Sequence, residues 1–98
     1  MMPAVTRIGD DDVPHCSGMV RIEGSGNVFC NSIAISRQGD NNTTHLKPCG
    51  IICCGHAAPI TTGSGTVFVN GVGCGRIGDA ITGCTEVAEG SGDVFAGG

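Results

Sequence analysis

The chain repeats one short pattern three times, and this repetition constrains its fold more than any other feature. Arg-x-Gly-Asp begins each copy, at residues 7–10, 37–40 and 76–79. Each copy later reaches Gly-Ser-Gly-x-Val-Phe, at residues 24–29, 63–68 and 90–95. Short units that recur in this way predict one body of similar, mutually packed parts. We expect a single domain over residues 1–98, with three pseudo-repeats that start near residues 7, 37 and 76.

One position of the repeat carries a good metal ligand in every copy. Five residues after the Asp stand His15, His45 and Cys84. If each copy forms one face of a three-sided body, these side chains meet near one pseudo-axis. The second copy holds an insertion that adds one more histidine, His56. Three imidazoles and one thiolate form a closed tetrahedral set, which suits a structural Zn²⁺. We therefore predict the metal ligands His15, His45, His56 and Cys84.

An alternative metal cluster lies within the insertion alone. Its members are close enough in sequence to chelate an ion: Cys49, Cys53, Cys54 and His56. This cluster lacks the paired Cys-x-x-Cys elements of common zinc sites, and it leaves the repeated position unexplained. The identity of the metal also stays open, because a His/Cys site accepts iron as well as zinc.

The glycine content and the spacing of apolar residues favour strands over helices. Eighteen glycines oppose helix formation, since each costs about 1 kcal/mol in a helix interior. Short β-branched runs are separated by turn residues, and Asn70-Gly71 is a type I′ hairpin signal. Val20 and Ile22 flank Arg21, the alternation of a half-buried strand. We predict an all-β fold, a small cone of short β-hairpins with pseudo-threefold symmetry, a metal-stapled apex and almost no helix.

The third copy is shorter than the others. It ends at Gly98, where the first two copies continue into the second strand of a hairpin. The sequence therefore predicts two and a half hairpin units. The only aromatic residues are three phenylalanines at equivalent repeat positions, and we interpret them as core, although the three Val-Phe pairs could also present similar surfaces to a partner.

Seven cysteines in a chain of 98 residues need an explanation. The number is odd, and the N-terminus lacks the apolar run of a secretory signal, so we expect reduced thiols. Free cysteine often acts as a small buried hydrophobe. We assign that role to five residues: Cys16, Cys30, Cys53, Cys54 and Cys74.

Charge and motif content exclude several classes of function. The net charge of −4 and the absence of a basic cluster argue against nucleic acid as a partner. No segment approaches the roughly 20 apolar residues that span a bilayer. A cysteine hydrolase would need an orienting third group and a cleft, and the sequence indicates neither, so we expect no enzyme. Each repeated Arg either pairs with the Asp three residues later or lies in solvent, and the sequence favours neither arrangement.

Together these motifs resemble the PAAR-repeat family, whose members cap the central spike of bacterial type VI secretion systems and contractile phage tails. The resemblance rests on the three Arg-x-Gly-Asp starts, the three Gly-Ser-Gly-x-Val-Phe segments, the Asn70-Gly71 turn and the His/His/His/Cys set. Where members often read Pro-Ala-Ala-Arg, this chain reads Val5-Thr6-Arg7, Ile35-Ser36-Arg37 and Cys74-Gly75-Arg76.

The resemblance implies a cone with one zinc ion near its tip, held by His15, His45, His56 and Cys84. Its base would dock on a trimeric spike, a VgrG-like protein or a phage tail-spike β-helix protein, with one copy per trimer. The tip would touch the target membrane transiently. The chain would reside in the bacterial cytoplasm before assembly, and later be injected with the spike or sit at a virion tail tip. The alternative is a stand-alone small zinc-binding interaction module unconnected with secretion.

Overall fold

The computed structural model describes residues 2–49 and 51–98, which form short antiparallel hairpins and no helix. The pairs are β1 (Phe29–Cys30) with β2 (Ile33–Ala34), β3 (His45–Cys49) with β4 (Ile52–His56), and β5 (Phe68–Val69) with β6 (Val72–Gly73). The predicted all-β fold of small hairpins is confirmed. Among these residues no helix has the length and hydropathy to cross a membrane.

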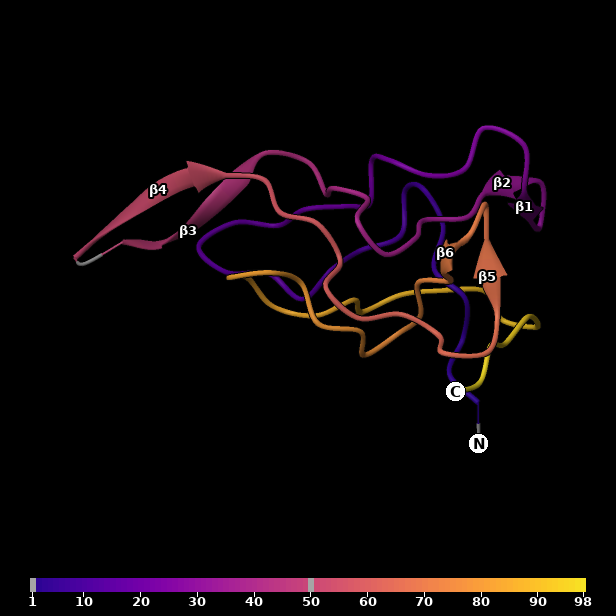
Figure 1. Cartoon of the computed structure of the whole chain (residues 1–98). Coiled ribbons are helices and arrows are strands. Elements are labelled where there is room, and N and C mark those ends of the chain that lie inside the picture. Colours follow the sequence, from indigo (N-terminus) through magenta and orange to yellow (C-terminus); the bar gives the residue numbers. More distant parts are fainter. Residues whose placement is uncertain (1, 50) are drawn as a thin grey trace.

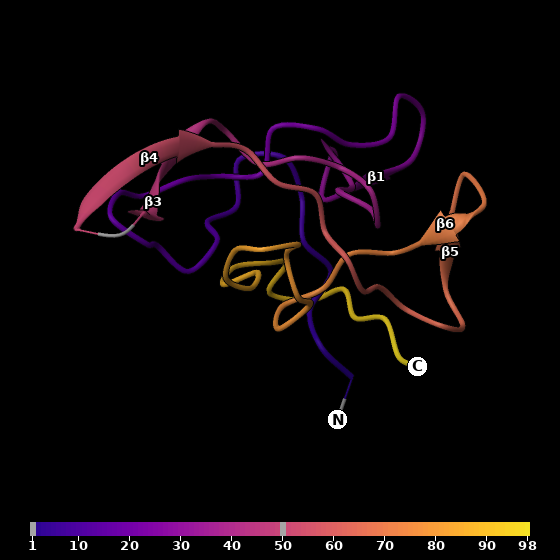
Figure 2. The same cartoon turned by 60° about the vertical axis from the view of Figure 1, so that its left-hand side comes forward.

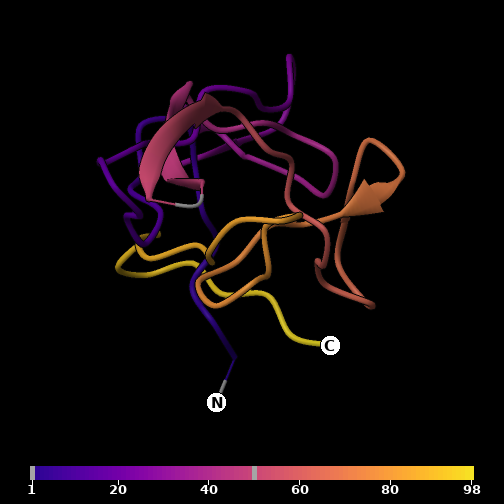
Figure 3. The ribbon, with the colours of Figure 1, turned by 90° about the vertical axis from the view of Figure 1, so that its left-hand side faces the viewer.

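The molecule is elongated, with extents of 40 × 24 × 24 Å. The β3–β4 hairpin projects from one end (Figure 1). Hairpins β1–β2 and β5–β6 lie toward the opposite end, as the rotated view in Figure 2 also shows. Seen from the β3–β4 end, the chain spreads in lobes around a common centre (Figure 3). The two ends of the molecule therefore differ in construction.

A closed ring of backbone hydrogen bonds marks the pseudo-threefold axis. Thr6 N–H donates to the Gly75 carbonyl at 3.0 Å, Gly75 to Ser36 at 3.1 Å, and Ser36 back to Thr6 at 3.1 Å. These three residues directly precede the three repeated arginines. A Cβ on Gly75 would lie 2.5 Å from the Ser36 carbonyl oxygen, so no side chain fits at this position unless the backbone shifts. The repeat seen in the sequence is thus a symmetry of the fold.

The missing half of the third hairpin comes from the N-terminal segment. Val5 N–H donates to the Val94 carbonyl, and Ala96 N–H donates to the Pro3 carbonyl, both at 3.0 Å. In the other copies the same bond joins Ile35 to Val28 at 3.2 Å and Cys74 to Val67 at 3.0 Å. The prediction of two and a half units is therefore wrong, since the two ends of the chain complete the third.

The repeated turns depend on glycine and on paired charges. Gly9, Gly39 and Gly78 have φ values of 92°, 92° and 89°, a left-handed region that glycine enters without steric cost. Each preceding Arg binds the following Asp. Nε of Arg7 and of Arg37 lies 2.9 and 2.8 Å from the carboxylate, and Nη2 of Arg76 lies 2.9 Å away. The structure therefore selects the paired arrangement. The predicted turn at Asn70-Gly71 is confirmed, with φ values of 56° and 82°.

The core at the β1–β2 and β5–β6 end consists of two symmetric sets of small side chains. These are Val5, Ile35 and Cys74, and the residues that follow the three phenylalanines, Cys30, Val69 and Ala96. The phenylalanines themselves point outward: Phe29, Phe68 and Phe95 are 57%, 61% and 48% exposed. The prediction that they form the core is wrong, because the space around the axis admits only small and medium side chains.

Residues 20–22 also reverse the predicted alternation. Arg21 is fully buried, whereas Ile22 is 55% exposed. Arg21 occupies the position that Ile60 and Val87 fill in the other two copies, since the glycine N–H groups of the three turns donate to their carbonyls at 2.8 to 2.9 Å. Its Nη1 lies 2.7 Å from Asp12 Oδ2, and its Nε donates to Ser36 Oγ at 3.1 Å. One copy thus places an ion pair where the others place aliphatic side chains.

Candidate metal centre

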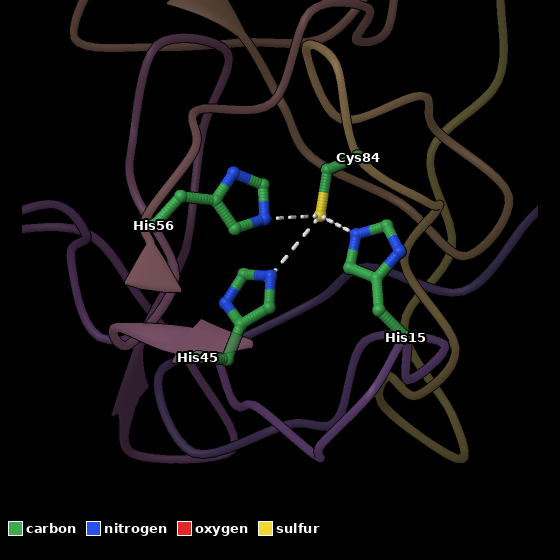
Figure 4. A group of neighbouring side chains, drawn as sticks. All are labelled: His15, His45, His56 and Cys84. Atoms are coloured by element: carbon green, nitrogen blue, oxygen red, sulfur yellow. Dashed lines mark hydrogen bonds between the residues drawn. The ribbon is translucent and has the colours of Figure 1, made fainter. Parts of the chain in front are cut away.

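The four predicted ligands come together at the β3–β4 end of the molecule. Their ligand atoms all lie within 4.8 Å of one another, and Figure 4 shows the three imidazoles around the Cys84 sulfur. His45 begins β3 and His56 ends β4, as direct partners in the register of that hairpin. His15 and Cys84 come from loops of the first and third copies. All three copies therefore contribute to one cluster that could hold a metal ion.

The distances fit a four-coordinate ion. The Nε2 atoms of His45 and His56 lie 3.3 and 3.6 Å from Cys84 Sγ. A tetrahedral ion with ordinary Zn–N and Zn–S bonds separates such atoms by about 3.5 Å. His15 Nε2 lies closer, at 2.7 Å from the sulfur, which is a hydrogen-bond contact between imidazole and thiol. Metal binding must displace the proton of that contact, because the ligands are the thiolate and the neutral imidazole.

The surroundings of the histidines favour the neutral imidazole, which is the form that binds a metal ion. His45 Nδ1 lies 2.8 Å from the Thr43 carbonyl oxygen, so Nδ1–H donates there and leaves the Nε2 lone pair toward the cluster. Desolvation lowers the pKa of His15 and of His56, and the nearby positive charges of His45 and Lys47 lower it further. Neutral imidazole, the metal-binding form, therefore persists to lower pH than in a free histidine.

A group of buried hydrophobic residues packs against the candidate metal site. Ile60, Ile81 and Val87 are almost fully buried, and Cys84 packs against them. Beside them Asn42 Nδ2 donates to Asp12 Oδ2 at 3.1 Å, while its Oδ1 accepts the Ala58 N–H at 2.9 Å. Burial raises the pKa of Asp12 more than the adjacent Arg21 lowers it. The loops that carry the ligands are thus anchored in a packed interior.

The alternative cluster in the insertion does not form. Cys49 is joined to Cys54 and Cys16 to Cys53 by disulfides, so these sulfurs are not free thiolates. Cys53 and Cys54 are neighbours on β4 and point to opposite faces of the hairpin, which separates the two bridges. His56, the remaining member, lies instead with His15, His45 and Cys84.

The prediction of reduced, buried cysteines is wrong for three of the five residues assigned that role. Cys16, Cys53 and Cys54 are disulfide-bonded, and Cys16 and Cys53 are also exposed. For Cys30 and Cys74 the prediction is confirmed, since both are free and buried. Burial raises the pKa of the Cys74 thiol to about 11, so it stays protonated at neutral pH. An odd count and local spacing could not reveal the pairing, because connectivity depends on the fold.

The disulfides give a direct chemical prediction. Under denaturing conditions with a chelator, the oxidised protein should expose three reactive thiols, those of Cys30, Cys74 and Cys84. After reduction, titration with a thiol reagent should find all seven. Seven thiols before reduction would show that the two bridges do not form.

A scan against models of known protein families finds no match to this chain, and a search of curated proteins finds none either.

Proposed function

We propose that this chain is the structural tip of the membrane-piercing spike of a contractile injection machine, a type VI secretion system or a phage tail. It would cap a trimeric β-helical spike protein, VgrG-like or from a phage tail, with one copy per trimer. The observation that carries the proposal is the pseudo-threefold fold with two unlike ends. One end gathers metal ligands from all three copies, and the other presents three equivalent exposed phenylalanines.

The end that carries the phenylalanines suits a trimeric partner. Phe29, Phe68 and Phe95 recur around the pseudo-axis and are about half exposed or more. Aromatic side chains, phenylalanine included, are enriched in protein interfaces, and exposed apolar patches often mark interaction sites. One chain with three similar faces can therefore make similar contacts with each subunit of a trimer. The two-residue strands that Phe29 and Phe68 begin also have edges that a partner would cover.

The opposite end suits a structural metal, which we propose to be zinc. His15, His45, His56 and Cys84 would fill all four positions of a tetrahedral ion and leave none for a substrate. We therefore propose no catalytic role for the site. The ion would join three copies of the repeat at the end of the molecule, next to the buried cluster of Ile60, Ile81 and Val87. The resulting tip would resist unfolding under force.

Binding to a purified trimeric spike tests this proposal. Native mass spectrometry should find one copy of this chain per trimer. Phe68→Asp should weaken the complex by about ten- to a hundredfold, because burial of one such side chain contributes about 1.5–3 kcal/mol. Leu46→Asp introduces the same charge at an exposed position on β3, near the other end, and should leave binding unchanged.

Two results would contradict the spike-tip role. One is three copies per trimer, which would mean that the pseudo-threefold body does not match the trimer axis. The other is no complex with either class of spike while the chain still binds one metal ion. That second result would favour the stand-alone metal-binding module.

A further inference from the structure

The end of the β3–β4 hairpin exposes two adjacent isoleucines. Ile51, between the strands, is 104% exposed, and Ile52, which begins β4, is 64% exposed. The hairpin projects along the long axis, away from β1–β2 and β5–β6 (Figures 1 and 2). Burying such side chains would be favourable, and nothing within the described residues covers them. These two residues form an apolar tip.

The charge around this apolar tip differs from that of the rest of the chain. Between Asp40 and Arg76 the only charged residue is Lys47, on β3, while all nine acidic residues lie outside that stretch. The hairpin thus carries a charge of +1 in a chain of −4. A divalent ion bound with one thiolate would add net positive charge next to it. The projecting end is therefore complementary to an anionic surface.

Two disulfides fix the hairpin in this projecting shape. Cys49–Cys54 links its two strands directly below the apolar tip. Cys16–Cys53 ties β4 to the loop that carries His15, and Cys16 N–H also donates to the Leu46 carbonyl at 3.1 Å. The isoleucines therefore cannot fold back onto the protein. A rigid apolar group also loses little conformational entropy when it is buried by a partner.

The size of the apolar tip favours a lipid surface over a protein partner. A stable protein complex buries about 800 Å² on each side, far more than two residues at a convex end can offer. A bilayer needs no such complementary shape. Interfacial apolar groups are buried about 5–10 Å into the boundary between headgroups and acyl chains. Lys47 lies two residues before Cys49, the last residue of β3, so it is about 7 Å along the strand from the end of the hairpin. The ammonium group would then lie among the headgroups.

We infer that the β3–β4 hairpin inserts Ile51 and Ile52 into the outer acyl region of an anionic bilayer, with Lys47 bound to the headgroup charge. This inference deepens the proposed function, because it assigns the part of a spike tip that first enters a membrane. It does not require the spike protein, since all the residues involved belong to this chain. Lipid insertion and spike binding can therefore be measured separately.

The absence of tryptophan from the chain allows a clean test. The whole oxidised, metal-loaded protein is made as Ile51→Trp, and its emission is recorded with vesicles of phosphatidylserine and phosphatidylcholine. We expect a blue shift and quenching by brominated acyl chains. Phe68→Trp is the matched control, because Phe68 is as exposed as Ile52 but lies toward the opposite end, and it should show neither change.

Two further substitutions in the Ile51→Trp protein give the expected size of the effect. Ile52→Asp should lower the partition coefficient about tenfold or more, given the transfer free energy of one such side chain. Lys47→Gln should lower it about fivefold on anionic vesicles and leave binding to neutral vesicles unchanged. Metal content of one ion per chain shows that each variant retains its fold.

Three outcomes would overturn the inference. The first is the absence of quenching for Ile51→Trp at any lipid concentration. The second is equal quenching of Phe68→Trp, which would indicate unspecific adsorption. The third is equal partition into neutral and anionic vesicles, which would remove the assigned lipid class. None of these outcomes bears on the spike complex, which is measured without lipid.

Discussion

Replacement of Cys84 with serine should abolish stoichiometric metal binding and sharply lower the thermal stability of the protein. Cys84 is the ligand from the third copy, and its sulfur lies within 3.6 Å of all three imidazoles. A structural zinc contributes about 10–16 kcal/mol of apparent binding free energy, as much as the whole stability of an ordinary domain. In a domain of this size each kcal/mol of lost stability lowers the unfolding midpoint by about 4–8 °C. Loss of several kcal/mol of the metal-binding free energy should therefore lower the midpoint by about 20 °C or more.

The measurement combines metal content by mass spectrometry with thermal unfolding of untagged protein. Cys30→Ser is the matched control, because Cys30 is free and buried in the other core cluster. It should retain one metal ion per chain. A chelator should reproduce the Cys84→Ser loss in the wild-type protein. Full metal retention by Cys84→Ser would show that the proposed ligand set is wrong.

Replacement of Arg21 with isoleucine should cost about 3–5 kcal/mol of folding free energy, even though isoleucine stands at the equivalent position of the second copy. The substitution leaves the Asp12 carboxylate buried without its cation, and an uncompensated buried charge carries a penalty of this size. The Asp40 carbonyl also loses the Arg21 Nη2 donor, at 2.5 Å. The loss comes from the isolated charge, not from the size of the isoleucine.

The double variant Arg21→Ile with Asp12→Asn separates these two causes. It gives the first copy the pair that the second copy already has, Asn42 and Ile60. Denaturant unfolding of the four proteins of this cycle should show that the double variant recovers at least half of the loss. Additive losses would mean that the two side chains do not act as a pair.

The sequence was sufficient for the symmetry and for the four clustered side chains, because both depend on register. His15, His45 and Cys84 share one offset from the repeated Asp, and any threefold packing brings equal offsets together. His56 followed from its place in the insertion. The residue types, three histidines and one cysteine, then indicated a tetrahedral metal site. None of these steps required knowledge of which way a strand faces.

Which side chains face the core could not be predicted from the sequence in the same way. Val67, Phe68 and Val69 are all apolar, and the fold buries only Val69. The space available near the pseudo-axis determines which of these side chains is buried. That space depends on contacts between the copies of the repeat. The inward turn of Arg21 depends likewise on acceptors from other segments, Asp12 and Ser36. The pairing of the N-terminal segment was missed because Ala4 pairs with Phe95, which is 91 residues away in sequence.

The pairing of residues 3–5 with residues 94–96 makes the three copies a closed circle with no first or last member. A linear array of repeats can lose an end unit and keep its inner ones, since each contacts only its neighbours. A circle has no such graded loss: opening one junction removes an inter-copy contact from two copies at once. Folding must also join the two most distant segments of the chain, and such long-range contacts favour slow folding. Cooperativity in this small fold therefore comes from its connectivity as well as from its core.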